Sequence, residues 1–373
     1  FTKERCCLNR LCGCYVDADK NKVVQFKEAF LSLPEEEIFK YFELLRKTLS
    51  GSLGKNLLNL DFPLASEQEG GTQAALLALR DSKLKDDALI EEFYDRVINT
   101  YEYVGNYLIL LIHDAYDVPG KTTDGLTMDD ASDTVFEYIM CCICPVNLSK
   151  PGLSYDSINN EFHNRIRDWV VEMPETGFLF PSFNDRATDI HSTLFYSKNP
   201  EEAHSEFVEN ILGCTMPLSA GTQKEAFQAL IEETLGDEVE YEVVKNIHEN
   251  LTEMIEEHKE IPEPLTLDKH QVKSLFEKSG VKEEKLTDFD KLYDAAAGED
   301  TSLFVNNVAN VRTFEVKTPD VVVKVNPERA DLVNTLQIDG KRCLVIEIND
   351  HVEVNGITIH QGVSLEDVAD EEE

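Results

Sequence analysis

The first half of the chain combines stretches of alternating apolar and polar residues with two stretches that are almost wholly apolar. The stretch RLCGCYVDADKNKVVQF (10–26) places two β-prone runs around a polar turn, so it predicts a hairpin. The apolar runs YLILLI and YIMCCICPV are far shorter than the roughly 20 residues of a membrane span. They predict buried strands over about 107–113 and 135–147. Further strands are expected at 57–64, 178–183 and 190–197.

Three segments between these strands have the period of an amphipathic helix. One covers about 34–49 and opens at Pro34 with three glutamates in its first turn, where acidic side chains favour the positive end of the helix dipole. A second is expected from Thr72 to about Asp81. The third covers 86–101, and its apolar face carries Leu89, Phe93, Val97 and Tyr101.

The second half of the chain changes character. Residues 200–263 carry seventeen acids and three lysines at mostly helical periodicity, and Pro262 and Pro264 end this stretch. Residues 265–298 predict a helical hairpin, whose six lysines and seven acids provide no basic face for DNA. Beyond it, VVVKV, TLQIDGKRCLVIEI and VEVNGITI predict a small β-rich unit.

Together these elements predict an α+β fold, with a mixed sheet flanked by helices, an acidic helical middle and a small β-rich domain at the end. The expected divisions are a core over 1–214 with a possible break near 150, an acidic helical segment over 215–264, a helical hairpin over 265–300, a β-rich domain over 312–363 and an acidic tail over 364–373.

The charge of the chain restricts its partners. A formal net charge of −37 repels nucleic acid and anionic membrane over most of the surface. Residues 1–60, with ten Lys/Arg and eight Asp/Glu, are the exception. A ribosomal or tRNA partner would therefore have to meet this N-terminal region, and neither DNA nor a membrane is expected as a partner.

Nine cysteines crowd into two clusters, with Cys214 and Cys343 apart from them. Adjacent cysteines suit a disulfide framework badly, so free, inward-packed thiols in a reducing cytoplasm are expected. The stretch CCLNRLCGC leaves a zinc site as an alternative, although its spacing differs from C-x2-C.

Calcium is an alternative at the hairpin turn. Asp17, Asp19, Asn21 and Glu28 fall at ligand positions of an EF-hand loop, but Lys22 stands where the sharp turn of that loop needs glycine. A hairpin without calcium is the favoured interpretation, and no cofactor is expected for the chain.

The stretch NLDFPLASEQEGGTQAALLALR (59–80) supplies the first candidate site. Its order of strand, Gly-Gly loop, glutamine and helix resembles the middle domain of eukaryotic and archaeal class-I release factors, with Thr72 separating the glycines from Gln73. The resemblance implies hydrolysis of the ester of peptidyl-tRNA, with Gly70 and Gly71 letting the backbone enter a crowded site. The backbone N–H of Gln73, on an exposed loop tip, would stabilise the oxyanion.

The stretch NDRATDIH supplies a second candidate site. It places Asp185, Asp189 and His191 between two predicted strands, and His113 ends another strand. Carboxylates and imidazole gathered at strand ends can bind a divalent metal and activate water. The alternative is a polar turn whose aspartates cap backbone N–H groups.

Over nearly its full length the chain resembles a family of uncharacterised proteins from clostridial Gram-positive bacteria. The segments that carry the resemblance are GCYVDADKNKV, YVGNYLILLIHDAYDVPGK, GFLFPSFNDRATDIHS and DGKRCLVIEI. The resemblance implies bacterial origin and a cytoplasmic location. The favoured function is a non-catalytic binding or regulatory protein with a protein partner. A release-factor-like hydrolase and a metal-dependent hydrolase are the alternatives.

Overall fold

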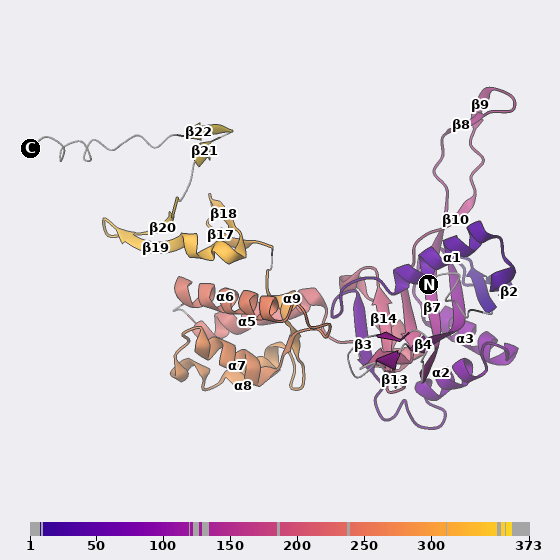
Figure 1. Cartoon of the computed structure of the whole chain (residues 1–373), viewed down its shortest axis with the longest axis horizontal. Helices are drawn as coiled ribbons and strands as arrows, with labels where there is room; N and C mark the ends of the chain where they lie inside the picture. Colours follow the sequence, from indigo (N-terminus) through magenta and orange to yellow (C-terminus); the bar gives the residue numbers. More distant parts are fainter. Residues whose placement is uncertain are drawn as a thin grey trace, which may run out of the picture. The chain divides into compact units, whose positions relative to one another are not determined.

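The computed structural model describes residues 8, 10–118, 120–121, 127–128, 134–184, 187–236, 239–310, 312–348, 352–354 and 356–359. The chain divides into two units, unit 1 (1–222) and unit 2 (223–373), and each is described by itself (Figure 1). Helices and strands both contribute substantially, so the expected α+β class is confirmed.

Unit 1 is built on one sheet with the strand order β2-β1-β4-β7-β11-β14-β3, and β10 pairs with β7 beside this path. Every pairing in it is antiparallel, so the expectation of a mixed sheet is wrong in this respect. The nearly continuous apolar runs of β4 and β7 arise instead because helices cover both faces of the sheet. The sheet strands are β1 (Arg10–Val16), β2 (Lys22–Ala29), β3 (Leu57–Asp61), β4 (Asn106–Val118), β7 (Thr134–Leu148), β10 (Trp169–Val171), β11 (Thr176–Phe180) and β14 (Ser192–Ser197).

Two apolar cores hold helices against the two faces of this sheet. On one face lie α2 (Thr72–Asp81), α3 (Asp87–Thr100) and the turn α4–η3 (Ser205–Leu212), which share a core with inward-facing residues of β1, β4 and β11 such as Phe178. On the other face lies α1 (Glu35–Thr48), packed through Ile38, Phe42 and Leu45. The hairpin strands β1 and β2 therefore share one sheet with β3 and β4, and α3 packs on that sheet.

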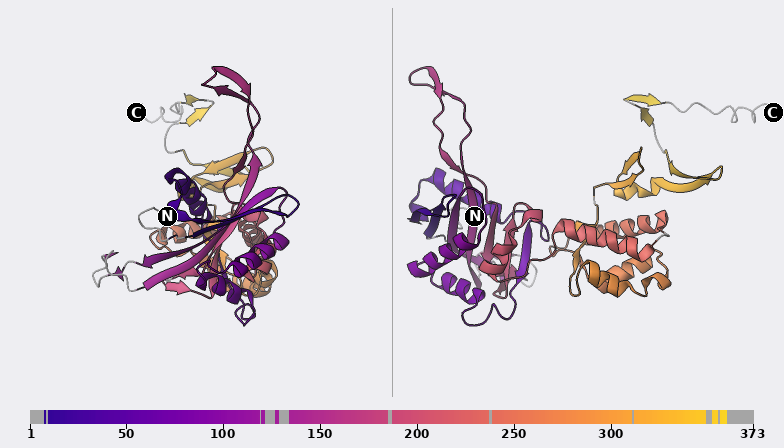
Figure 2. Two further views of the ribbon diagram at one scale, coloured as in Figure 1. Left: turned by 90° about the vertical axis from the view of Figure 1, so that its right-hand side faces the viewer. Right: turned by 180° about the vertical axis from the view of Figure 1, so that it is seen from behind.

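Three small hairpins complete the described part of unit 1. They are β5–β6 (Gly120–Lys121 with Thr127–Met128), β8–β9 (Leu153–Asp156 with Glu161–Asn164) and β12–β13 (Ser182–Asn184 with Ala187–Asp189). The β8–β9 hairpin projects away from the rest of the unit, as Figures 1 and 2 both show.

The turn that suggested calcium joins β1 to β2 as a tight hairpin, so the predicted hairpin is confirmed. One carboxylate oxygen of Asp17 accepts hydrogen bonds from the backbone N–H groups of Asp19 and Asn21, and the other accepts from the Asn21 side chain. The aspartate therefore closes the turn, a common use of this residue type. Seven cysteines lie in the described residues as free thiols, six of them buried; Cys6 and Cys7 lie outside those residues.

In its described residues, unit 2 combines four longer helices with small hairpins. The helices are α5 (Ala220–Leu235, which begins in unit 1), α6 (Tyr241–Glu257), α7 (Lys269–Lys278), α8 (Phe289–Ala296) and the short α9 (Val305–Val308). The paired strands are β15 (Thr266–Leu267) with β16 (Leu303–Phe304), β17 (Phe314–Lys317) with β18 (Val322–Val325), β19 (Val333–Ile338) with β20 (Lys341–Ile346) and β21 (Val352–Val354) with β22 (Ile357–Ile359). The 3-10 turn η5 (Pro327–Leu332) packs on α6. None of the helices in the described residues is long and apolar enough to cross a membrane.

Candidate functional site

The Gly-Gly loop links β3 to α2, and its two glycines have different reasons to be glycine. Gly70 has a φ of +83° and open space around the position of a side chain. Gly71 is the residue before the first turn of α2, and a Cβ there would lie 2.3 Å from the carbonyl oxygen of Ser66. The loop is thus folded tightly back on itself at Gly71, which explains that glycine without any catalytic role.

Gln73 does not lie at an exposed loop tip, so that expectation is wrong. The residue belongs to the first turn of α2 and is only 4% exposed. Its side-chain amide donates a hydrogen bond to the carbonyl oxygen of Ile190 (3.0 Å), and its backbone N–H donates to Ser66 (3.1 Å). The backbone N–H that would have to stabilise an oxyanion is therefore already used inside the protein.

The second candidate site lies directly beside the first. Besides the contact from Gln73 to Ile190, Nδ1 of His191 lies 2.6 Å from Oε1 of Glu67 in the glycine loop. One oxygen of the Asp189 carboxylate accepts hydrogen bonds from the hydroxyl of Ser192 and the amide of Asn184, and the other accepts from the backbone N–H of His191. Two segments separated by more than a hundred residues are joined by these contacts.

The pKa values of these groups follow from the same contacts. Partial burial opposes ionisation of Asp189, but its three hydrogen bonds outweigh this and lower its pKa. The hydrogen bond to Glu67 raises the pKa of His191. Burial raises the pKa of Asp61, on the neighbouring strand, and the charge of Asp189 adds to the effect.

A metal centre is not assembled from the described part of this region. Asp185 lies outside the described residues. Asp189 is engaged as a turn cap and His191 as the partner of Glu67. Among the residues that the structure describes, no group of three or more His, Cys, Asp and Glu side chains is placed to hold an ion. The contacts of Gln73 with Ile190 and of Glu67 with His191, here named the clasp, hold the glycine loop and the start of α2 against the turn before β14.

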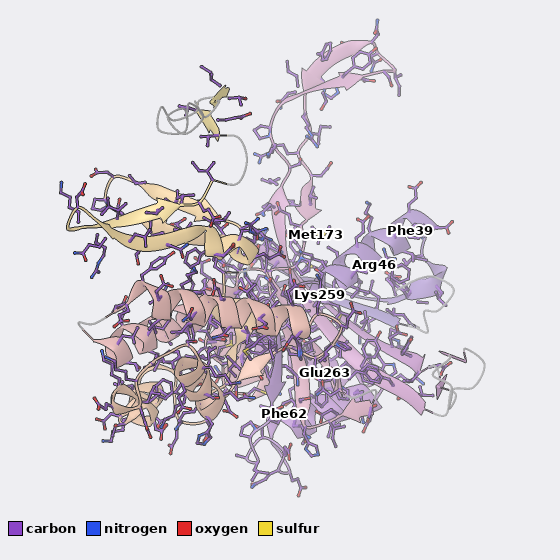
Figure 3. All side chains as sticks on the ribbon, turned by 60° about the vertical axis from the view of Figure 1, so that its left-hand side comes forward. Phe39, Arg46, Phe62, Met173, Lys259 and Glu263 are labelled. Carbon is purple, nitrogen blue, oxygen red and sulfur yellow. The ribbon has the colours of Figure 1, made fainter. Side chains whose placement is uncertain are left out.

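A second feature of unit 1 is a projecting segment with exposed apolar side chains. Residues 149–172, here named the arm, leave β7, form the β8–β9 hairpin and return as β10. Large apolar side chains are exposed along its whole length: Leu153 77%, Tyr155 55%, Ile158 91%, Phe162 71%, Ile166 79% and Trp169 55%. In Figure 3 the side chains at the end of the arm stand clear of the rest of unit 1.

The apolar side chains of the hairpin share one face. Tyr155 is directly opposite Phe162 in the ladder, and their rings lie 5.3 Å apart. Leu153, two positions before Tyr155, lies on the same face because side chains alternate along a strand. The polar residues Ser154 and His163 oppose each other on the other face. The hairpin is therefore an amphipathic ribbon with its apolar face open.

A groove lies at the base of the arm, beside α1. It has a volume of about 530 Å³, and its apolar lining consists of Tyr41, Leu44, Leu108, Val171 and Met173. Its rim carries Glu36, Glu37, Lys40 and Glu43, of which Lys40 and Glu43 form an ion pair with each other. Figure 3 labels Met173 near the base of the arm.

The sequence reasoning missed both the arm and the groove. The signal available was the short alternation LSYD with EFHN, which is typical of an amphipathic hairpin. Its apolar residues gave no sign that they lack a core, because alternation shows which residues share a face and does not show what covers that face.

A comparison with known protein families identifies the family of this chain. The family described as a domain of unknown function, DUF4317, matches residues 1–357. The chain belongs to this family. The family match runs through both units and includes the arm and the groove. No curated protein matches the sequence.

Proposed function

We propose that this protein acts by binding protein, without catalysis, and that the arm is its binding element. The observation that carries the proposal is the open apolar face of the arm. A two-stranded hairpin is marginally stable in water on its own, and exposed clustered apolar side chains mark interaction sites. A partner that covers Leu153, Tyr155 and Phe162 would stabilise the hairpin and would remove these apolar side chains from water.

The partner we propose is a second copy of the chain, with the arm of each copy in the groove of the other. The groove offers an apolar lining of matching character and a rim on which Glu36 and Glu37 form no ion pair with the described residues. The stem of the arm carries the complementary charges. Arg165 and Arg167 likewise form no ion pair within the described part of the chain, although Arg167 donates to a backbone carbonyl.

The expected affinity is moderate. Burial of one large apolar side chain contributes about 1.5–3 kcal/mol, and the reciprocal dimer buries two arms, so the six side chains of the two apolar faces contribute roughly 9–18 kcal/mol before association costs. Those costs are about 4–15 kcal/mol, so further contacts at Ile158, Ile166 and the groove are needed to reach micromolar affinity. A dissociation constant of about 1 μM is the expectation.

Paired variants of the two faces of the arm test the proposal by size-exclusion chromatography with light scattering. Tyr155→Ser with Phe162→Ser removes the apolar face and is expected to leave the chain monomeric. His163→Ser changes the opposite face of the same ribbon and should leave the dimer unchanged. Equal behaviour of the two variants would contradict the role of the apolar face.

Charge reversal distinguishes a second copy from another protein. Arg165→Glu with Arg167→Glu should weaken self-association, and so should Glu36→Lys with Glu37→Lys. A chain carrying all four substitutions restores opposite charges between arm and groove, and it should dimerise again. Failure of the combined variant to recover, with wild-type folding by circular dichroism, would rule out this pairing.

The location proposed for this activity is the cytoplasm. The seven described cysteines are free thiols, and five of them are buried on β1 and β7 of the sheet, where a reducing environment keeps them as packed apolar groups.

A further inference from the structure

A cavity in unit 2 lies between helices α5 and α6 and the β17–β18 hairpin. Its volume is about 660 Å³, within the usual range for small-molecule sites. The apolar part of its wall includes Phe227, Val244, Val308 and Phe314. Figures 1 and 2 both show the β17–β18 and β19–β20 hairpins lying over the helices of unit 2.

The charge around this cavity is opposite to that of the unit that contains it. Residues 223–373 hold fifteen Lys/Arg and thirty-six Asp/Glu, a net charge of −21. The cavity, by contrast, is lined by four cations and two acids: Lys224, Lys245, Lys317 and Arg342 with Glu249 and Glu315. A local excess of positive charge in an acidic unit attracts anions to this position.

The two acids are already engaged, which leaves three cations for a ligand. Glu315 forms an ion pair with Lys324 (3.0 Å), and Glu249 lies 3.9 Å from the buried Lys245. Lys224, Lys317 and Arg342 form no ion pair with any residue that the structure describes. They come from α5, β17 and β20, so three separate elements bring unpaired positive charge to one cavity.

An aromatic wall lies beside these cations. The Phe314 ring is 6.4 Å from the Tyr241 ring and 6.3 Å from the His248 ring. Burial lowers the pKa of His248, and the charge of Lys224 adds to this, so its imidazole is neutral at physiological pH. A neutral imidazole and two rings offer surfaces for a planar group, while the cations lie at the exposed rim.

We propose that this cavity binds a small molecule that carries both a planar ring and phosphate groups, the chemistry of a nucleotide. The guanidinium of Arg342 and the ammonium groups of Lys224 and Lys317 would bind the phosphates, because charge-assisted hydrogen bonds to phosphate are the strongest available to these side chains. Phe314 would pack against the ring. This site is separate from the arm and does not depend on self-association.

Isothermal titration calorimetry of the full chain with ADP, pyrophosphate and adenosine tests the proposal. ADP is expected to bind more tightly than either of the other two, since only ADP engages both the cations and the aromatic wall. No heat from ADP at about 1 mM, the weak limit of specific affinity, would overturn the proposal. Equal affinity for ADP and pyrophosphate would overturn it as well, because the ring would then contribute nothing.

Matched variants locate the binding site. Arg342→Ala should weaken ADP binding about tenfold or more, the loss expected for one charge-assisted contact. Lys341→Ala removes the same charge from the adjacent residue of β20, which does not line the cavity, and should leave the affinity within about twofold. Lys317→Ala, at an exposed position that can change without unfolding the unit, should also weaken binding. Equal losses in Arg342→Ala and Lys341→Ala would show nonspecific charge attraction and refute the site.

Discussion

Replacing Gly71 with alanine separates a structural role of the glycine loop from a catalytic one. The added Cβ would lie 2.3 Å from the Ser66 carbonyl oxygen and 2.9 Å from that of Gln68, and both are backbone atoms that cannot rotate away. The loop would have to open, which weakens two hydrogen bonds: from the backbone N–H of Gly71 to Gln68 (2.8 Å) and from that of Gln73 to Ser66 (3.1 Å).

The magnitude follows from these contacts. Overpacking costs about 1–3 kcal/mol, and the loss of two hydrogen bonds adds roughly 0.5–1.5 kcal/mol each, so a destabilisation of about 2–6 kcal/mol is expected. The matched control is Gly70→Ala, which meets no atom within 4 Å and costs only the strain of its positive φ, about 1–2 kcal/mol.

Urea denaturation followed by far-ultraviolet circular dichroism measures both variants. From highest to lowest, the expected order of the free energies of unfolding is wild type, then Gly70→Ala, then Gly71→Ala. A Gly71→Ala protein within about 0.5 kcal/mol of wild type would refute the reasoning, since that is the range of ordinary surface substitutions. That result would also support the alternative hypothesis of an exposed, functional loop, in which the glycine is needed only when a ligand approaches.

Three further predictions concern buried and paired groups. Gln73→Ala should cost about 0.5–1.5 kcal/mol by urea denaturation, because it removes a partly buried hydrogen bond to the carbonyl oxygen of Ile190; a cost near zero would contradict the clasp. In NMR titration the pKa of His191 should exceed its usual 6.5 and return toward it in Glu67→Gln. This raised pKa stabilises the fold fully below about pH 6.5, and the contribution is lost as the pH rises through the folded-state pKa; an unchanged midpoint in the variant would count against the pair. Burial raises the pKa of Cys12 and of Cys14 to about 11, so neither should react with a thiol reagent at pH 8 until the protein unfolds, as mass spectrometry of labelled peptides can check.

The sequence predicted the elements of unit 1 well where a face is buried. The helix expected from Thr72 to Asp81 has those bounds, and the buried strands at 107–113 and 135–147 correspond to β4 and β7. Burial of one face imposes a period on the sequence, and that period can be recognised without the partner.

Features that depend on distant partners could not be predicted. The side chain of Gln73 donates a hydrogen bond to Ile190, 117 positions away, and the sequence near either residue does not predict this contact. The pairing of β3 with β14 at the edge of the sheet and the entirely antiparallel order are equally nonlocal. The structure brings the two separately predicted sites together through Gln73 and His191, and their polar groups are bonded within the protein.

The arm shows a different limit of prediction from the sequence. Its apolar residues have a clear local pattern, but the pattern of Leu153, Tyr155 and Phe162 is the same whether a core or a partner covers them. Only the fold shows that these side chains are exposed and that an apolar groove edged by glutamates lies at the base of the arm.

Sedimentation equilibrium of the wild-type chain over about 0.1–100 μM, a range that brackets the expected affinity, tests self-association through the arm most directly. The chain has a mass of 42.3 kDa, and the account predicts a rise toward twice that mass as the concentration increases. A single species of 42.3 kDa at every concentration would contradict it.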